Sequence, residues 1–168
     1  MFKKYFVLTT VFLMLSITVF AGGKKVNFSG EWVLDYEKTE MAENQISLIK
    51  ISIKQVGDDL FTVRTYESDY DGGQYPFDED LTLDGIEHKI YIYEMPRTAS
   101  ASWSKNGKSI IINSKITFYG DVGDVDWINK ETLTLEEKGT LLLINFTSKA
   151  GDEETEGTLY FKEEESKK

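Results

Sequence analysis

Apolar and polar residues alternate with a period of two along most of this chain. In residues 46–56, Ile49, Ile51 and Ile53 alternate with lysine and serine, and the same alternation recurs in residues 109–119. Because successive side chains of a β-strand point to opposite faces of the sheet, this pattern predicts strands with one apolar and one solvated face. We therefore expect the isoleucines to point into a core.

Turn signals stand between these alternating runs. Gly57-Asp58-Asp59, Asp84-Gly85, Asn106-Gly107 and Lys138-Gly139 each provide a residue that tolerates a positive φ angle. Only residues 39–45 could hold a helical turn. The sequence thus predicts ten strands joined by hairpins, at residues 27–36, 46–56, 60–68, 77–83, 88–95, 98–105, 108–119, 126–137, 140–148 and 154–163.

Such a meander has no strand–helix alternation, which excludes a parallel sheet. Its apolar face must still be covered. Closure into an up-and-down barrel covers that face and also removes the exposed sheet edges. The predicted fold class is therefore all-β, an antiparallel meander of about ten strands closed into a β-barrel, with a two-sheet β-sandwich as the alternative.

The first 21 residues have a different pattern. Lys3 and Lys4 precede an apolar run that ends at the small residue Ala21. The run lasts about 16 residues, whereas a membrane-spanning helix needs roughly 20, so we predict a secretory signal peptide cleaved after Ala21. The mature protein would be periplasmic or secreted. No cysteine follows the run, so it would not be an ordinary acylated lipoprotein.

Cleavage would leave 147 of the 168 residues, the usual size of one domain. We place this domain at residues 22–163 and expect a disordered charged tail at residues 164–168. Without cysteine, the exported domain would rely on packing rather than on disulfides. Cleavage also takes the formal net charge from −10 to −12. Such a surface repels nucleic acid and anionic lipid headgroups, so we expect no nucleic-acid partner and no membrane insertion.

The first predicted strand contains the motif Gly30-Glu31-Trp32. With its flanking residues 27–35, this motif resembles the opening strand of the lipocalin-like (calycin) proteins, in which the indole lies across one end of a barrel. The resemblance implies a lipocalin-like β-barrel that holds a small apolar or amphipathic ligand. Further stretches resemble bacterial lipocalin-like domains of unknown function: residues 83–88, Trp103 ahead of Asn106-Gly107, and residues 131–135.

One feature of classical lipocalins is missing from this chain. They pack an arginine from a late strand against the tryptophan, whereas the arginines here are Arg64 and Arg97, and the late strands offer Lys149 and Lys162. This departure indicates a remote bacterial relative rather than a classical lipocalin.

Residues suited to catalysis are sparse. His88 is the sole histidine, cysteine is absent, and no Gly-x-Ser-x-Gly elbow is present. These features exclude thiol chemistry and offer no partner for a Ser-His-Asp triad. The 29 acidic residues are scattered through turns, so no pair is distinguished as an acid and a base. We predict that the protein is not an enzyme and uses no cofactor.

Two acidic segments raise the question of calcium binding. Residues 69–80 begin with an Asp-x-Asp-Gly sequence, which resembles the start of a calcium loop. However, Gly73 stands where a third ligand belongs, and Asp80 occupies the position of the usual glutamate. Residues 121–126 form a weaker version. We expect solvated loops and no metal site.

Aromatic residues make up 13% of the chain, which is high enough to line a pocket. The leading hypothesis is that the barrel binds a small hydrophobic or amphipathic ligand. The alternative is a non-catalytic envelope interaction or structural module that acts through its surface. For the first hypothesis we expect an overwhelmingly apolar lining with one polar point, Ser114. The candidate lining residues are Trp32, Ile51, Val63, Ile112, Ser114, Phe118, Ile144 and Phe146.

Overall fold

The computed structural model describes residues 25–39, 46–120 and 123–164. The predicted signal peptide and most of the predicted helical turn at 39–45 lie outside these residues. The described strands match the predicted ones in number and order, with ends that differ by up to four residues, and a short 3₁₀ turn, η1 (Glu137–Gly139), precedes β9. The strands are β1 (Gly30–Leu34), β2 (Ile46–Val56), β3 (Asp59–Ser68), β4 (Gln74–Thr82), β5 (Asp84–Ile92), β6 (Met95–Trp103), β7 (Ser109–Phe118), β8 (Val125–Glu136), β9 (Leu141–Ala150) and β10 (Glu153–Glu163).

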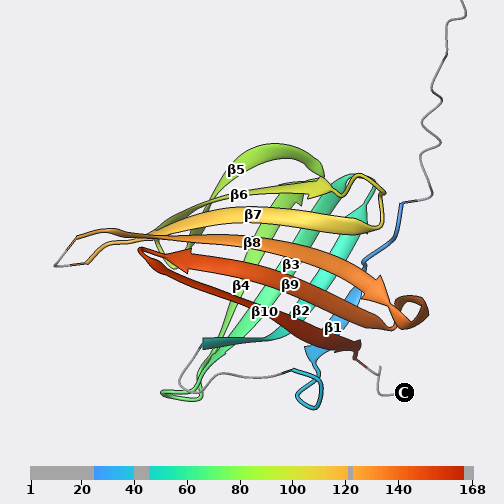
Figure 1. Cartoon of the computed structure of the whole chain (residues 1–168), viewed down its shortest axis with the longest axis horizontal. Coiled ribbons are helices and arrows are strands. Elements are labelled where there is room, and N and C mark those ends of the chain that lie inside the picture. The colour runs from blue at the N-terminus through green and yellow to red at the C-terminus, as the bar shows by residue number, and fades with distance from the viewer. Residues whose placement is uncertain (1–24, 40–45, 121–122, 165–168) are drawn as a thin grey trace, which may run out of the picture.

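All ten strands form one antiparallel sheet that curls into a nearly closed barrel. Its order is β4-β3-β2-β1-β10-β9-β8-β7-β6-β5, so the first strand pairs with the last. In Figure 1, β2, β3 and β4 lie behind β6 to β10 and cross them steeply. This arrangement confirms the predicted all-β meander and barrel.

The barrel wall is interrupted between β4 and β5, which stand at the two ends of the sheet order. Side chains bridge this interval. The Oγ1 atom of Thr82 lies 2.9 Å from Nε2 of His88, and the Tyr93 hydroxyl donates to the Pro76 carbonyl at 2.7 Å. His88 therefore helps to hold the β4–β5 junction together.

Hairpin turns explain most of the strand boundaries. Gly57, Gly85 and Gly107 have φ angles of 64°, 81° and 68°, as their turn signals predict. The β5–β6 turn is an exception, because it consists of Tyr93 and Glu94 with φ angles of 46° and 71°. Neither residue favours this region, so tertiary pairing overrides local preference there. The predicted boundary between these two strands lies about three residues too late for this reason.

A β-bulge between Leu48 and Lys50 shifts the inward-pointing set of β2. Leu48, Ile51 and Ile53 are buried, while Ile49 is only partly buried. The prediction that Ile49 shares the inner face with Ile51 is therefore wrong, because the extra residue of a bulge reverses the alternation before it.

Trp32 is buried, as the resemblance to the lipocalin-like proteins implies, and is 2% exposed. Its indole Nε1 donates to the Phe28 carbonyl at 3.1 Å. The indole also lies against Gly30, where an added Cβ would stand 3.0 Å from Nε1. The Gly-x-Trp motif thus has a local cause: the ring folds back over the space that the missing side chain leaves.

Candidate functional site

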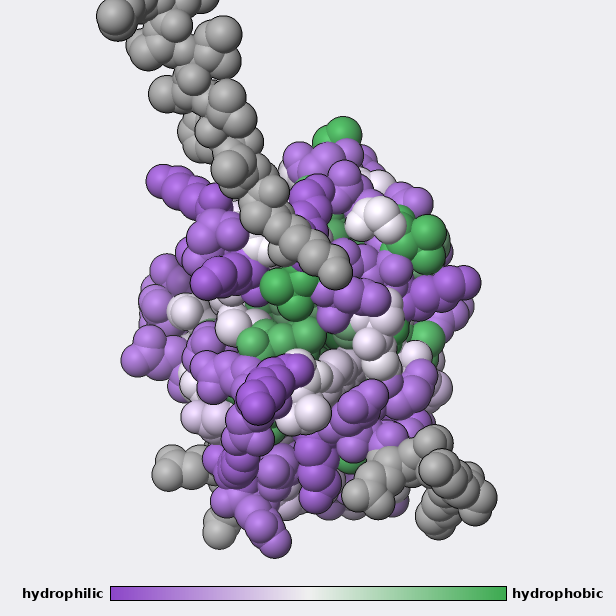
Figure 2. Space-filling model, turned by 90° about the vertical axis from the view of Figure 1, so that its right-hand side faces the viewer, coloured by the Kyte–Doolittle hydropathy of each residue, from purple (hydrophilic) through white to green (hydrophobic). Residues whose placement is uncertain are grey.

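The barrel lumen has a packed end, which contains Phe28 and Trp32. The Phe28 ring lies 6.2 Å from that of Trp103, the last residue of β6, and Figure 1 shows the β6–β7 and β8–β9 turns on the same side of the barrel. In Figure 2, which looks onto this side, apolar surface is confined to small patches among hydrophilic residues. The buried apolar side chains include Phe28, Trp32, Ile53, Leu60, Leu81, Ala101, Ile110, Ile112, Leu133, Leu142, Ile144 and Phe161.

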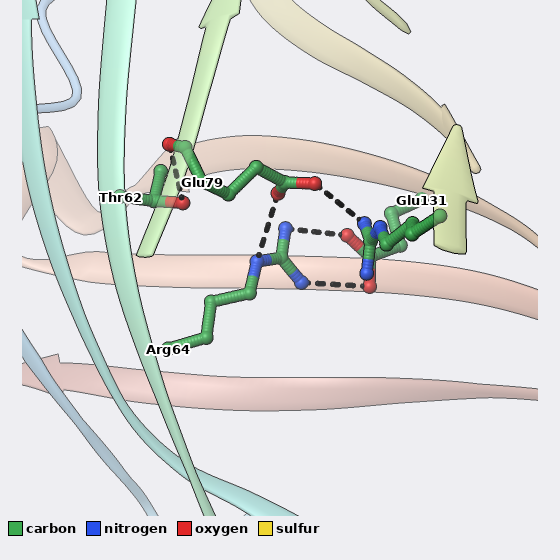
Figure 3. Close-up of polar contacts among 5 residues, drawn as sticks. Thr62, Arg64, Glu79 and Glu131 are labelled. Atoms are coloured by element: carbon green, nitrogen blue, oxygen red, sulfur yellow. Dashed lines mark hydrogen bonds and ion pairs between the residues drawn. The ribbon is translucent and has the colours of Figure 1, made fainter. Parts of the chain in front are cut away.

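Four charged side chains cross the lumen next to this apolar layer. Arg64 of β3, Glu79 of β4, Arg97 of β6 and Glu131 of β8 form what we call the ion cluster. Figure 3 shows Arg64 and Glu131 pointing toward each other from separate strands. The contacts span strands that are far apart in the sheet order, so the cluster ties opposite walls of the barrel together.

Arg64 makes the best-formed contacts of the ion cluster. Its Nη1 and Nη2 atoms donate to the two carboxylate oxygens of Glu131 at 2.9 and 2.7 Å. This bidentate geometry is the strong form of an arginine–carboxylate pair. The Nε atom of Arg64 lies farther away, 3.5 Å from Oε2 of Glu79, and makes no hydrogen bond.

Glu79 and Arg97 are less completely satisfied. Nη2 of Arg97 lies 2.7 Å from Oε1 of Glu79, yet neither Glu79 oxygen has an aligned hydrogen bond. The Nε atom of Arg97 is buried without a hydrogen-bond partner. Native proteins leave few buried polar atoms in this condition, so each one calls for an explanation.

Burial and charge pairing act in opposite directions on the ion cluster. Burial opposes the charge of Arg64, but Glu131 and Glu79 outweigh it and raise the arginine's pKa well above its usual range. Burial likewise favours neutral Glu131, but the Arg64 charge prevails and lowers the pKa of that carboxyl. Two cations and two anions give the cluster a formal charge of zero.

Beyond the ion cluster, side chains at inner-face positions remain accessible, and we call this part of the barrel the open end. Trp127 and Val125 of β8 are four and six residues before Glu131 and so lie on the same inner face of the strand. They are 43% and 44% exposed. Tyr75 of β4 is 39% exposed. The Trp127 ring lies 5.6 Å from that of Phe118, and Tyr66 stacks on Phe77 at 5.6 Å. This end is aromatic and incompletely covered.

The structure divides the residues predicted to line a cavity between the two ends. Trp32, Ile51, Ile112 and Ile144 are buried on the packed side, among side chains of the apolar core. Ser114 is buried near the boundary, and Phe118 and Phe146 are partly buried toward the open end. The predicted residues therefore do not gather around one shared space.

The prediction that Val63 points inward is wrong. Val63 is exposed and pairs with Ser52 and Asp78, whereas its neighbours Thr62 and Arg64 are buried. In β3 both faces carry apolar residues, so hydrophobicity alone does not reveal the inward set. Leu60 is buried, so residues an even number of positions away from it, such as Arg64, point to the same inner face.

The predicted lining, apolar except for Ser114, is also wrong, because sequence reasoning missed the ion cluster. A faint signal was available for one member. The chain contains only two arginines, and Arg64 lies within a predicted strand, whereas Arg97 falls between two predicted strands. Nothing in local alternation pairs either arginine with a glutamate, since the partners come from other strands.

Two hollows on the surface of the described residues are lined mostly by outer-face side chains. The larger has a volume of about 490 Å³ and opens on the outer faces of β8, β9 and β10. The smaller, of about 220 Å³, lies by Asp126 and Gly151. The larger hollow is lined by Lys130, Thr132, Asn145, Phe146, Thr147, Glu156, Gly157 and Thr158.

In the acidic segment at 69–80, the Asp71 carboxylate is hydrogen-bonded to other residues of the same segment. Asp71 accepts hydrogen bonds from the Tyr75 hydroxyl at 2.6 Å and from the Gly73 amide at 2.9 Å, which lower its pKa. Within the described ranges, no group of three or more histidine, cysteine or acidic side chains could hold a metal ion. Asp121 of the second acidic segment lies outside those ranges. Nor do the described residues include a helix long and apolar enough to cross a bilayer.

No protein-family model and no curated protein matches this sequence. The structure is similar to the crystal structure of a luciferase domain from the dinoflagellate Lingulodinium polyedrum, with 7% sequence identity and a TM-score of 0.45. The match covers 80% of this chain and 41% of that chain, so this chain spans less than half of its length.

Proposed function

We propose that this protein is an exported, lipocalin-like carrier that binds a small amphipathic ligand at the open end of the barrel. The observation that carries the proposal is the contrast within one lumen. Apolar inner-face side chains at the open end are left accessible, and the buried ion cluster, which contacts Phe77, has hydrogen-bonding atoms without partners. A ligand with an apolar body and a polar end matches both surfaces.

The side chains at the open end are of the kinds found in small-molecule binding sites. Small-molecule sites are concave and mostly apolar, with a few polar groups that fix orientation. The open end supplies Trp127, Phe118 and Phe77 as apolar contacts, and the ion cluster supplies the polar group. Burying apolar ligand surface would contribute about 25 cal/mol per Å². Export follows from the predicted signal peptide, and no catalytic step is required.

The test is a titration with a fluorescent amphipathic probe, alongside native mass spectrometry of protein purified after export. Wild-type protein is expected to give a saturable signal, and the spectrum a mass increment from a co-purified molecule. Trp127→Ala should weaken probe binding several-fold. Ile128→Ala is the matched control, because Ile128 is the next residue, is similarly exposed and points outward. Equal loss in both variants, or no saturation with wild type, would reject the proposal.

A surface interaction module is the second candidate function, and the outer hollow over β8 to β10 favours it. This hollow is larger than the other, and it is rich in hydroxyl, amide and charged groups. Charge substitutions at Lys130 and Glu156 would separate the two functions. They should leave probe binding intact if the ligand enters the open end, whereas a surface module would lose its partner.

A further inference from the structure

The open end carries two aromatic pairs, which we call walls, on the inner faces of strands that are far apart in the sheet order. Arg64 of β3 reaches Glu131 of β8 at 2.7 Å, which places these strands opposite each other at the ion cluster. The next inner-face position of β3 toward the open end is Tyr66, stacked on Phe77 with only 14° between the rings. On the β8 side stands Trp127 with its neighbour Phe118.

Arg97 lies beside the Tyr66–Phe77 wall. It is 8% exposed, its guanidinium carbon lies 5.7 Å from the centroid of the Phe77 ring, and its Nε–H has no acceptor. Arg97 thus belongs to the ion cluster through Glu79 and to the aromatic wall through Phe77. A ligand atom that accepts a hydrogen bond there would satisfy a donor that the folded chain leaves unpaired.

The charge balance decides what kind of acceptor fits. The ion cluster is already neutral, so a carboxylate ligand would bring an uncompensated negative charge into a buried site beside Glu79. The whole chain carries a formal charge of −10, which also repels anions at long range. An uncharged carbonyl or amide oxygen meets the donor without either cost.

Resting on the proposed function, we propose that the ligand is an uncharged, planar aromatic molecule whose acceptor oxygen binds the Arg97 Nε–H. Its rings would lie between the Tyr66–Phe77 wall and the Phe118–Trp127 wall. Stacked or edge-to-face contacts stabilise aromatic pairs beyond the effect of the area they bury. An alkyl chain makes no such contacts.

Isothermal titration calorimetry with three matched probes tests this ligand class at neutral pH. 2-Naphthamide has flat rings and a neutral acceptor, 2-naphthoate has the same rings with a charge, and nonanamide has the same acceptor on an alkyl chain. We expect 2-naphthamide to bind about tenfold more tightly than each of the others. Trp127→Leu should reduce that preference over nonanamide, and Arg97→Lys, which keeps a cation for Glu79 but lacks the Nε–H, should weaken 2-naphthamide selectively. Ile128→Ala should change neither.

The outcomes separate this inference from the proposed function. Tighter binding of 2-naphthoate would overturn the requirement for an uncharged ligand, and equal binding of nonanamide would overturn the aromatic requirement. In either case a ligand site in the barrel would still stand. If none of the three probes binds while an amphipathic fluorescent probe saturates, the ligand class alone is rejected. If that probe also fails, both proposals fall. Should Arg97→Lys not fold, the wild-type selectivity and Trp127→Leu still decide the question.

Discussion

The two ends of this barrel have the same strands and the same alternation but different degrees of closure. At the packed end Trp32 and Phe28 are fully buried, whereas Trp127 and Val125 at the open end remain nearly half exposed on the inner face. Strand length contributes to the difference. β1 has five residues, while β7 and β8 have 10 and 12 and extend well past it, as Figure 1 shows. The ion cluster lies between the packed end and the more exposed end.

We expect the largest difference in stability between variants of the two tryptophans, one at each end. Trp32→Ala should lower the free energy of unfolding by about 3–5 kcal/mol, because it leaves a cavity in a packed core. Trp127→Ala should cost less than about 1 kcal/mol, because the indole is already in contact with water. Chemical denaturation of both variants measures this difference. Similar midpoints would show that the ends are packed equally well.

Removing one member of the ion cluster should have the next largest effect. Arg64→Met is expected to lower the free energy of unfolding by about 3 kcal/mol at neutral pH, since it leaves Glu131 and Glu79 without their shared cation. The value lies at the low end for a broken buried pair because Glu131 retains some contact with water. Replacing the Lys115–Asp126 surface pair should cost under about 1 kcal/mol and serves as the control.

The ion cluster should also make the free energy of unfolding depend on pH in the acidic range. The pKa of Glu131 is lower in the folded protein than in the unfolded chain. Its stabilising contribution is therefore complete above the unfolded value of about 4.3 and is lost as the pH falls through the lower folded value. Urea unfolding of wild type and Glu131→Gln should show a stability difference that narrows below about pH 4. A difference that stays constant down to pH 2.5 would contradict the pairing.

Gly157→Ala should have a smaller effect, confined to the side of the barrel near the open end. An added Cβ would stand 2.9 Å from two atoms of the Phe146 ring. Phe146 is only partly buried, so its ring can turn aside, and we expect a loss of about 1 kcal/mol. Probe affinity should change as the ring moves, which titration of the variant measures. Gly57→Ala, at an open turn with positive φ, is a control that should alter stability without altering affinity.

The smallest expected effect is that of calcium. Because Asp71 is engaged by Tyr75 and Gly73, millimolar calcium or a chelator should leave the melting temperature unchanged. A rise of several degrees with calcium that disappears in Asp71→Asn would establish a site that the acidic segment alone does not reveal.

The sequence was sufficient to predict the fold because its information is local. Alternation sets which face of a strand is apolar, and glycine or asparagine at a turn sets where the chain reverses, as at Gly57 and Gly107. Ten hairpin-linked strands then leave few ways to cover the apolar face. The burial of Trp32 followed from the same local pattern. Predictions failed where local and tertiary preferences differ, at the Leu48–Lys50 bulge and at the Tyr93–Glu94 turn.

The candidate site, by contrast, was decided by tertiary structure. Arg64 and Glu131 are 67 positions apart, and no spacing rule connects them; only closure of the barrel brings β3 opposite β8. Burial of a charge is tolerated when a partner of opposite sign is close, and that condition depends on the whole sheet. The same closure determines which inner-face aromatics are covered and which stay accessible. The sequence by itself therefore determined the strands, their faces and the barrel, while the tertiary structure decided where the lumen is charged and where it is open.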